Sequence, residues 1–122
     1  MAEGGASEPD GLVGWRLEDD GRVAEITVLA VREDARRRGV GRALLDTAVE
    51  ALRATGVQRA WLVTTNDNLP ALGLYQRAGW RLSVLRPGAV DAARLTLKPG
   101  IALVGEGGIP IRDELELELE LG

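Results

Sequence analysis

Apolar and polar side chains alternate in the first third of the chain in a way that predicts two paired strands. The runs 12–17 and 23–31 are rich in apolar residues, and the Asp20-Gly21 dipeptide between them is typical of a tight hairpin turn. We therefore predict an antiparallel hairpin. Both faces of the second run are mostly apolar, so we expect this strand to be central in its sheet and covered on both sides.

The middle of the chain changes to a helical period. Between Val40 and Thr55, apolar residues recur at three- and four-residue steps, and Gly56 is the expected stop. A second helix, with Pro70 in its first turn, ends at Gly79. Short apolar runs at 60–64 and 80–85 predict one strand after each helix.

The ends of the chain differ in character. Residues 1–10 are small and acidic, which predicts a flexible tail before a single domain over residues 11–122. Residues 86–108 are irregular, with one short helix over 90–97. Residues 114–121 alternate strictly between glutamate and leucine, which predicts a half-buried strand, with an acidic low-complexity tail as the alternative. The element order predicts an α/β (α+β) fold with a mixed, mostly antiparallel sheet flanked by helices.

Composition excludes several kinds of chemistry. The 122 residues include no cysteine and no histidine, which rules out disulfides, histidine bases and the usual zinc ligands, so we expect no metal site. The net charge of −4 argues against a nucleic-acid partner, although arginines crowd residues 32–42. The start resembles no signal peptide and no run is long enough for a membrane span, so we expect a cytoplasmic protein. Trp15, Trp61 and Trp80 are predicted core residues.

The richest chemical signal is the segment Arg36-Arg37-Arg38-Gly39-Val40-Gly41 between a strand and a helix. Amides in the first turn of a helix lack internal partners and attract anions, glycines let an anion approach, and arginines add bidentate donors. The segment therefore predicts a pyrophosphate seat. It is neither a Walker A loop nor a full GxGxxG sequence, and a helix start with solvated arginines is the alternative.

With its flanking strand and helix, this segment resembles the acetyl-CoA loop of the GNAT acetyltransferase superfamily. A second match lies downstream, where Asn68, Ala71, Tyr75 and Gly79-Trp80 are similar to the family's Asn-x-x-Ala-x-x-x-Tyr-x-x-x-Gly-aromatic segment. The resemblance covers residues 12–86 and implies a short, bacterial-type, N-terminally abbreviated member of the GNAT fold. It implies acetyl-CoA as co-substrate and an amine acceptor, with these cofactor-binding residues: Leu29, Ala30, Val31, Arg36, Arg37, Arg38, Gly39, Val40, Gly41, Arg42, Ala43 and Asn68.

The resemblance also implies N-acetylation by direct attack of a primary amine of a small molecule or peptide on the thioester. Tyr75, the one tyrosine, is the predicted acid for the leaving thiolate, and a backbone N–H of the central strand would polarise the carbonyl. Glu25 is the predicted base, since the two-residue period puts it on the face of Leu29 and Val31; a salt-bridged strand residue is the alternative. Asn66 and Asp67 are weaker candidates, more typical of a turn.

Few residues precede the hairpin, where family members usually carry further elements that help build the acceptor site. A non-catalytic acyl-CoA-binding or regulatory module is therefore the main alternative function. Because an exposed sheet edge invites cover, we also expect a homodimer.

Overall fold

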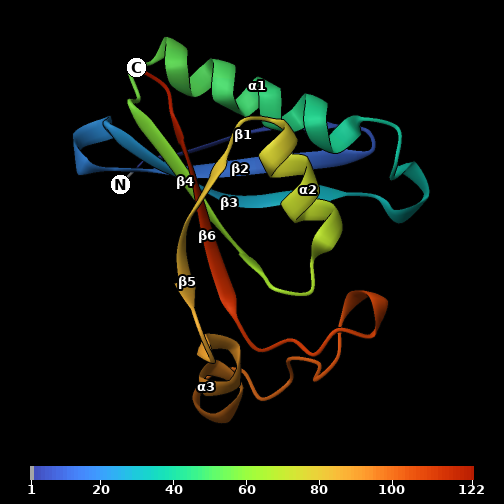
Figure 1. The fold of residues 1–122 in the computed structure, drawn as a ribbon. Coiled ribbons are helices and arrows are strands. Elements are labelled where there is room, and N and C mark those ends of the chain that lie inside the picture. The colour runs from blue at the N-terminus through green and yellow to red at the C-terminus, as the bar shows by residue number, and fades with distance from the viewer. Residues whose placement is uncertain (1) are drawn as a thin grey trace. The chain divides into compact units, whose positions relative to one another are not determined.

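The computed structural model describes residues 2–122, and across these residues the chain forms one six-stranded sheet and three α-helices (Figure 1). The strands lie in the order β1-β2-β3-β4-β6-β5. The strands are β1 (Glu3–Glu8), β2 (Gly11–Glu18), β3 (Val23–Val31), β4 (Arg59–Thr65), β5 (Arg81–Arg86) and β6 (Glu114–Glu120). The helices are α1 (Val40–Ala54), α2 (Leu69–Arg77) and α3 (Ala89–Thr96).

These bounds confirm the predicted α/β class and nearly all predicted elements. The hairpin, both main helices and the short helix near residue 90 begin and end within two residues of their predicted limits. The glutamate–leucine run is strand β6, with Leu117 and Leu121 buried, so the alternative of an acidic tail is wrong. Of the three tryptophans, Trp80 is buried, whereas Trp15 and Trp61 are half-buried.

The flexible tail predicted for residues 1–10 is wrong over residues 3–8, which form β1. This strand pairs antiparallel with β2 along its whole length, from Glu3 opposite Arg16 to Glu8 opposite Gly11. Its glycines serve close packing: a Cβ at Gly4 would lie only 2.5 Å from the Trp15 Nε1 atom. The small residues that suggest disorder in the sequence are therefore those that let β1 lie against the Trp15 ring.

A β-bulge interrupts the pairing of β2 with β3. The register runs from Glu18 opposite Val23 to Trp15 opposite Ile26, and then shifts so that Gly14 lies opposite Val28, leaving Thr27 as the extra residue. Residues opposite each other share a face, so Leu29 and Val31 lie with Ala24 and Ile26. Glu25 lies with Val28 and Ala30 on the other face. The prediction that Glu25 shares a face with Leu29 and Val31 is therefore wrong, because the bulge breaks the two-residue period.

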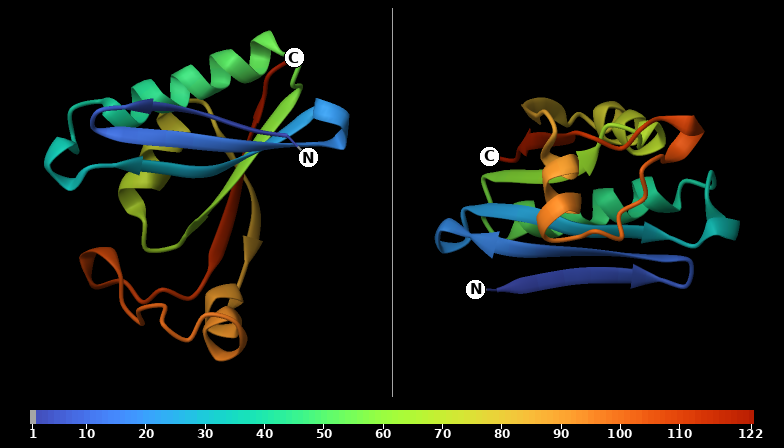
Figure 2. Two further views of the ribbon diagram at one scale, coloured as in Figure 1. Left: turned by 180° about the vertical axis from the view of Figure 1, so that it is seen from behind. Right: turned by 90° about the horizontal axis from the view of Figure 1, so that it is seen from below.

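Helix α1 covers one face of the N-terminal strands. Figure 2 shows β1, β2 and β3 side by side with α1 along them. The helix buries Leu44, Leu45, Ala48 and Leu52, and the strands contribute Val13, Ala24 and Ile26. The other face of the hairpin is open near its far end, where Leu12 is 44% and Val28 41% exposed. Strand β3 is central as predicted, but it is covered on both sides only over its first half.

By its contacts the chain divides into two compact units. The N-terminal unit holds the chain up to Leu62 together with Leu119–Gly122, and the second unit holds Val63–Glu118. The predicted extent of the single domain, residues 11–122, stays a prediction.

Polar side chains organise the second unit where the sequence is irregular. The Arg94 guanidinium donates to the carbonyl oxygens of Ile101, Ala102 and Ile111. Asn66 accepts from the amides of Arg112 and Asp113, both at 3.0 Å. These bonds hold residues 97–113 by side-chain contacts to the main chain, which explains why no hydrophobic period marks the segment.

Candidate functional site

The segment of residues 36–42, called here the loop–helix junction, joins the short turn after β3 to the first turn of α1 (Figure 1). Its backbone is unusual at two positions. Arg37 has a φ of 68° and Gly39 a φ of 79°, both in the left-handed region that non-glycine residues rarely adopt. A Cβ at Gly39 would meet no atom within 4 Å. The glycine is therefore required by the backbone conformation and not by close packing.

The amides of the loop–helix junction are available. Those of residues 37–42 donate no hydrogen bond to another group of the residues that the structure describes. No side chain caps α1, whose N-cap residue is Gly39. By contrast, the Ala43 amide donates to the Gly39 carbonyl at 3.0 Å and is already used. The free amides and the positive end of the helix form a donor set suited to an oxyanion.

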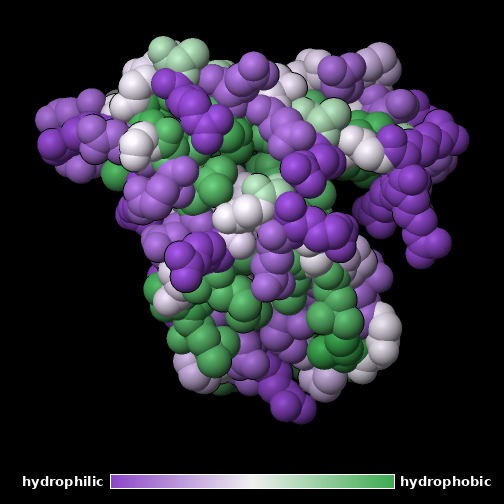
Figure 3. Space-filling model, turned by 45° about the horizontal axis from the view of Figure 1, so that its top comes forward, coloured by the Kyte–Doolittle hydropathy of each residue, from purple (hydrophilic) through white to green (hydrophobic). Residues whose placement is uncertain are grey.

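Three guanidinium groups surround these amides without a partner. Arg36, Arg37 and Arg38 are exposed, and none forms an ion pair with a residue in the described part of the chain. The arginines on either side differ, since Arg32 is held by Asp10 and Asp34, and Arg42 by Asp46. The right-hand edge of the space-filling view, where this loop lies, is hydrophilic (Figure 3). The site's unpaired positive charge is thus confined to three consecutive residues.

The strand that leads into the junction is only briefly paired with β4. The parallel pairing covers three positions, from Val23 opposite Arg59 to Glu25 opposite Trp61. Residues Leu29, Ala30 and Val31 pair with β2 on the other side. The predicted hydrogen bonding of these three residues to a pantetheine arm stays a prediction.

Glu25 is held by an arginine that the sequence analysis missed. Arg16 lies opposite Glu25 in the hairpin register, and its Nη2 atom forms an ion pair with the Glu25 Oε1 atom. The Glu25 side chain is 17% exposed. Counting outward from the Asp20-Gly21 turn would have placed Arg16 beside Glu25. The salt-bridged strand residue named as the alternative for Glu25 is thus observed, and its role as a base stays a prediction.

Asn68 and Tyr75 belong to the second unit. Asn68 is the N-cap of α2, and its Oδ1 atom accepts from the Ala71 amide at 3.3 Å. Tyr75 is 9% exposed, its ring centre lies 6.3 Å from that of Trp80, and burial raises the pKa of its phenol. Desolvation favours the neutral form of a phenol, so Tyr75 is protonated at neutral pH, as a proton donor must be. The roles predicted for these two residues remain predictions.

Asn66 and Asp67, the weaker candidates, have structural roles. Asp67 is 6% exposed, its Oδ1 atom accepts from the Thr65 hydroxyl, and its Oδ2 atom accepts from the Glu106 amide. Asn66 bonds the main chain at residues 110, 112 and 113. Both side chains tie the end of β4 to the irregular segment.

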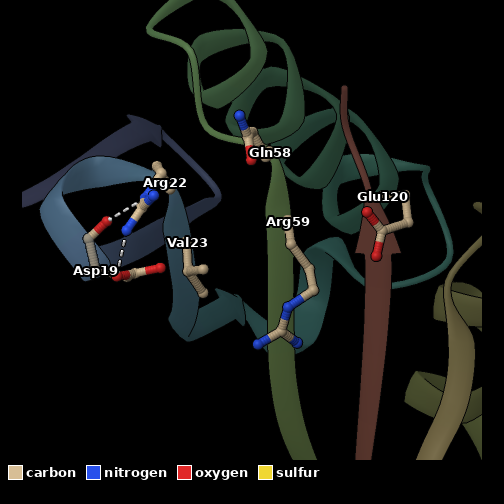
Figure 4. Close-up of a pocket in the computed structure, with 6 residues that line it drawn as sticks. All are labelled: Asp19, Arg22, Val23, Gln58, Arg59 and Glu120. Carbon is tan, nitrogen blue, oxygen red and sulfur yellow. Dashed lines mark hydrogen bonds and ion pairs between the residues drawn. The ribbon is translucent and has the colours of Figure 1, made fainter.

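An open pocket of about 290 Å³ lies in the N-terminal unit at the start of β3, at the opposite end of that strand from the loop–helix junction. Figure 4 shows Arg22 bonded to Asp19, with Arg59 and Glu120 projecting from β4 and β6. None of the predicted site residues lines this pocket. It therefore does not serve as the candidate site.

Among residues 2–122, no group of three or more carboxylate, histidine or cysteine side chains is arranged to hold a metal ion. None of the helices in the same range is long and apolar enough to cross a bilayer.

The fold and the loop–helix junction together define an α/β protein with an anion-binding site at the start of its longest helix, and comparison with known proteins gives the family. Residues 5–80 match the family model described as "Acetyltransferase (GNAT) family". The chain belongs to this family, as its two sequence motifs predict.

Three similar proteins illustrate the relationship. The uncharacterised protein YxbD of Bacillus subtilis is 41% identical over 115 residues, which cover 86% of this chain and 72% of YxbD. A mycothiol acetyltransferase of Beutenbergia cavernae is 42% identical over 66 residues, but these cover only 22% of that enzyme. The crystal structure of a Bacillus subtilis acetyltransferase in complex with CoA superposes with a TM-score of 0.79 at 26% identity, covering 94% of this chain and 71% of that one.

Proposed function

We propose that the protein is an acetyl-CoA-dependent N-acetyltransferase that acts on a primary amine of a small molecule or peptide. The observation that carries the proposal is the loop–helix junction, where free amides and unpaired guanidinium groups coincide. A diphosphate ester is the ligand that this donor set fits, because its oxygens can accept from several amides while its charge is balanced by arginine. The similar acetyltransferase crystallised with CoA supports the same assignment.

In the proposed reaction, the neutral amine attacks the thioester carbonyl carbon and forms a C–N bond. The carbonyl oxygen gains negative charge, which a backbone N–H of β3 stabilises. Glu25 takes the proton from the attacking nitrogen, directly or through water. The C–S bond then breaks, and the coenzyme A thiolate takes the proton of the Tyr75 phenol, which is protonated beforehand because burial raises its pKa. Glu25 then releases its proton to solvent and the Tyr75 phenolate regains one, which restores both groups.

One observation favours the alternative of a non-catalytic acyl-CoA-binding module. The Glu25 carboxylate already forms an ion pair with Arg16, which gives it a structural partner within the hairpin. A binding module would still bind coenzyme A at the loop–helix junction but would not transfer the acetyl group, so binding and turnover must be measured separately.

The binding test is a calorimetric titration with coenzyme A. We expect saturable binding by the wild type and a Kd raised at least tenfold when Arg36, Arg37 and Arg38 are all changed to glutamine. The matched control is Arg32→Gln, in the same turn, because its guanidinium is already paired with Asp10 and Asp34. Wild-type protein that gives no response to coenzyme A would refute the proposal.

The turnover test follows thiol release from acetyl-CoA in the presence of a panel of primary amines. Amine-dependent thiol release, accompanied by the acetylated amine in mass spectrometry, supports the transferase. Tight coenzyme A binding without release from any amine favours the binding module. The cytoplasmic location and the homodimer predicted from the sequence remain predictions, and one dimer surface is argued next.

A further inference from the structure

The strand β5 ends the sheet order and leaves an apolar edge uncovered. All six of its residues are exposed, with Leu82 at 51%, Val84 at 39% and Leu85 at 58%. Open edge strands of this kind present unpaired main-chain donors and acceptors to another chain.

A second bulge sorts the side chains of β5 into two chemically distinct faces. The register pairs Leu82 with Leu117 and Leu85 with Leu115, and the shift between Leu82 and Val84 leaves Ser83 as the extra residue. Both leucines therefore lie on the face of the buried Leu117, although they are three residues apart. On the opposite face, Arg81 and Arg86 lie beside the glutamates of β6.

We propose that β5 pairs antiparallel with β5 of a second copy of the chain, about a two-fold axis between Ser83 and Val84. The strand sequence Arg-Leu-Ser-Val-Leu-Arg reads nearly the same in both directions, as an isologous interface requires. In this register Leu82 lies opposite Leu85 of the second copy, and the two pairs of leucines extend one apolar face across the axis. A shift by one residue in either direction would place one of the leucines opposite an arginine of the second copy.

The charges are compatible with this register. Arg86 forms ion pairs with Glu114 and Glu116, and Arg81 lies opposite Glu118 in the β5–β6 register. Across the axis, Arg81 would face Arg86 of the second copy, with a glutamate outside each arginine. The net charge of each such row of two arginines and two glutamates is therefore zero, and the glutamates offset the repulsion between the facing arginines.

The opposite end of the sheet order lacks these properties. Strand β1 has the sequence Glu-Gly-Gly-Ala-Ser-Glu and carries no large apolar side chain. Self-pairing of β1 would bring glutamates of the two copies together, and Arg16, which lies opposite Glu3 in β2, is already paired with Glu25. Charged, glycine-rich edges are a usual protection against pairing. Of the two edge strands, β5 is therefore the one that suits pairing with a second copy of the chain.

Cysteine cross-linking tests the register directly, because the chain contains no cysteine. From a rise of about 3.3 Å per residue and a strand spacing of about 4.8 Å, the two Ser83 Cα atoms would lie about 6 Å apart. This separation suits a disulfide. The Arg81 Cα atoms would lie about 17 Å apart by the same dimensions. We expect mild oxidation to link Ser83→Cys protein into dimers and to leave Arg81→Cys, in the same strand, unlinked.

Sedimentation equilibrium tests the surface. We expect wild-type protein to reach twice the 13.0 kDa mass of one chain, and Leu82→Lys to raise the dimer dissociation constant at least tenfold. Leu95→Lys on α3, where the side chain is 86% exposed, is the control and should leave the constant unchanged. A monomer at every concentration, equal linking of both cysteine variants, or dissociation by the control overturns the proposal. None of these outcomes bears on coenzyme A binding.

Discussion

Replacing Gly39 by alanine tests whether the conformation of the loop–helix junction is set for a ligand. Gly39 and Gly56 flank α1, both have a left-handed φ, at 79° and 88°, and at neither would a Cβ meet an atom within 4 Å. Their neighbourhoods differ in one respect. The Gly56 amide donates to Arg53, and the following amide of Val57 donates to Leu52, so the fold itself holds that turn. The Gly39 amide donates to nothing in the described residues.

The two alanine variants should therefore fail in different assays. An L-residue in the left-handed region costs roughly 1–2 kcal/mol. At Gly56 the hydrogen bonds force alanine to keep that conformation, so the cost appears in the free energy of unfolding and lowers Tm by about 4 °C or more. At Gly39 only one internal bond, from the Ala43 amide to the Gly39 carbonyl, opposes relaxation in the free protein, because the Gly39 amide itself has no acceptor among the described residues. Binding must then restore the conformation, which raises the Kd for coenzyme A by about 5- to 30-fold.

The assays are thermal unfolding and calorimetric titration with coenzyme A on both variants. Gly39→Ala should keep a Tm close to that of the wild type and lose affinity, whereas Gly56→Ala should lose Tm and keep affinity. Gly39→Asn should lie between wild type and Gly39→Ala in affinity, since asparagine tolerates the left-handed region better. The reasoning is refuted if Gly39→Ala binds coenzyme A within twofold of the wild type.

Three further outcomes follow from burial and hydrogen bonding. Tyr75→Phe should lower kcat by roughly 10²-fold. Because burial raises the Tyr75 pKa, the neutral phenol stabilises the fold below about pH 10, and this contribution is lost as the pH rises further. The Tm of the wild type should therefore fall more steeply than that of the variant between about pH 10 and about pH 11. Gly4→Val should weaken β1, visible as faster amide exchange over residues 3–8, because its side chain would overlap the Trp15 ring; unchanged exchange would contradict the packing. Asp67→Ala should lower the free energy of unfolding by about 1–3 kcal/mol, measured by urea denaturation, because the Glu106 amide loses its acceptor; a smaller effect would mean that water replaces the carboxylate.

Local sequence signals predicted most of the fold, and the misses share a physical cause. The Asp20-Gly21 turn, the period of α1 and the stop at Gly56 each depend on residues close together in the chain, and all three predictions are confirmed. Strand β1 has almost no intrinsic strand preference. It forms because its glycines fit against Trp15 of the neighbouring strand, a contact that no local pattern announces.

The same distinction divides the candidate site. The loop–helix junction is formed by one short segment, and its glycine and arginines predict it whatever the register of the neighbouring strands. The environment of Glu25 depends on the Thr27 bulge and on Arg16, both of which follow from how two strands pair. A bulge moves every later side chain of the strand to the opposite face, and the amino-acid composition of the strand gives no sign of it. Binding of the pyrophosphate is therefore the part of the proposed function that rests on local chemistry, and acid–base catalysis is the part that rests on register. A variant that removes Arg16, the partner of Glu25, should accordingly change turnover more than coenzyme A affinity.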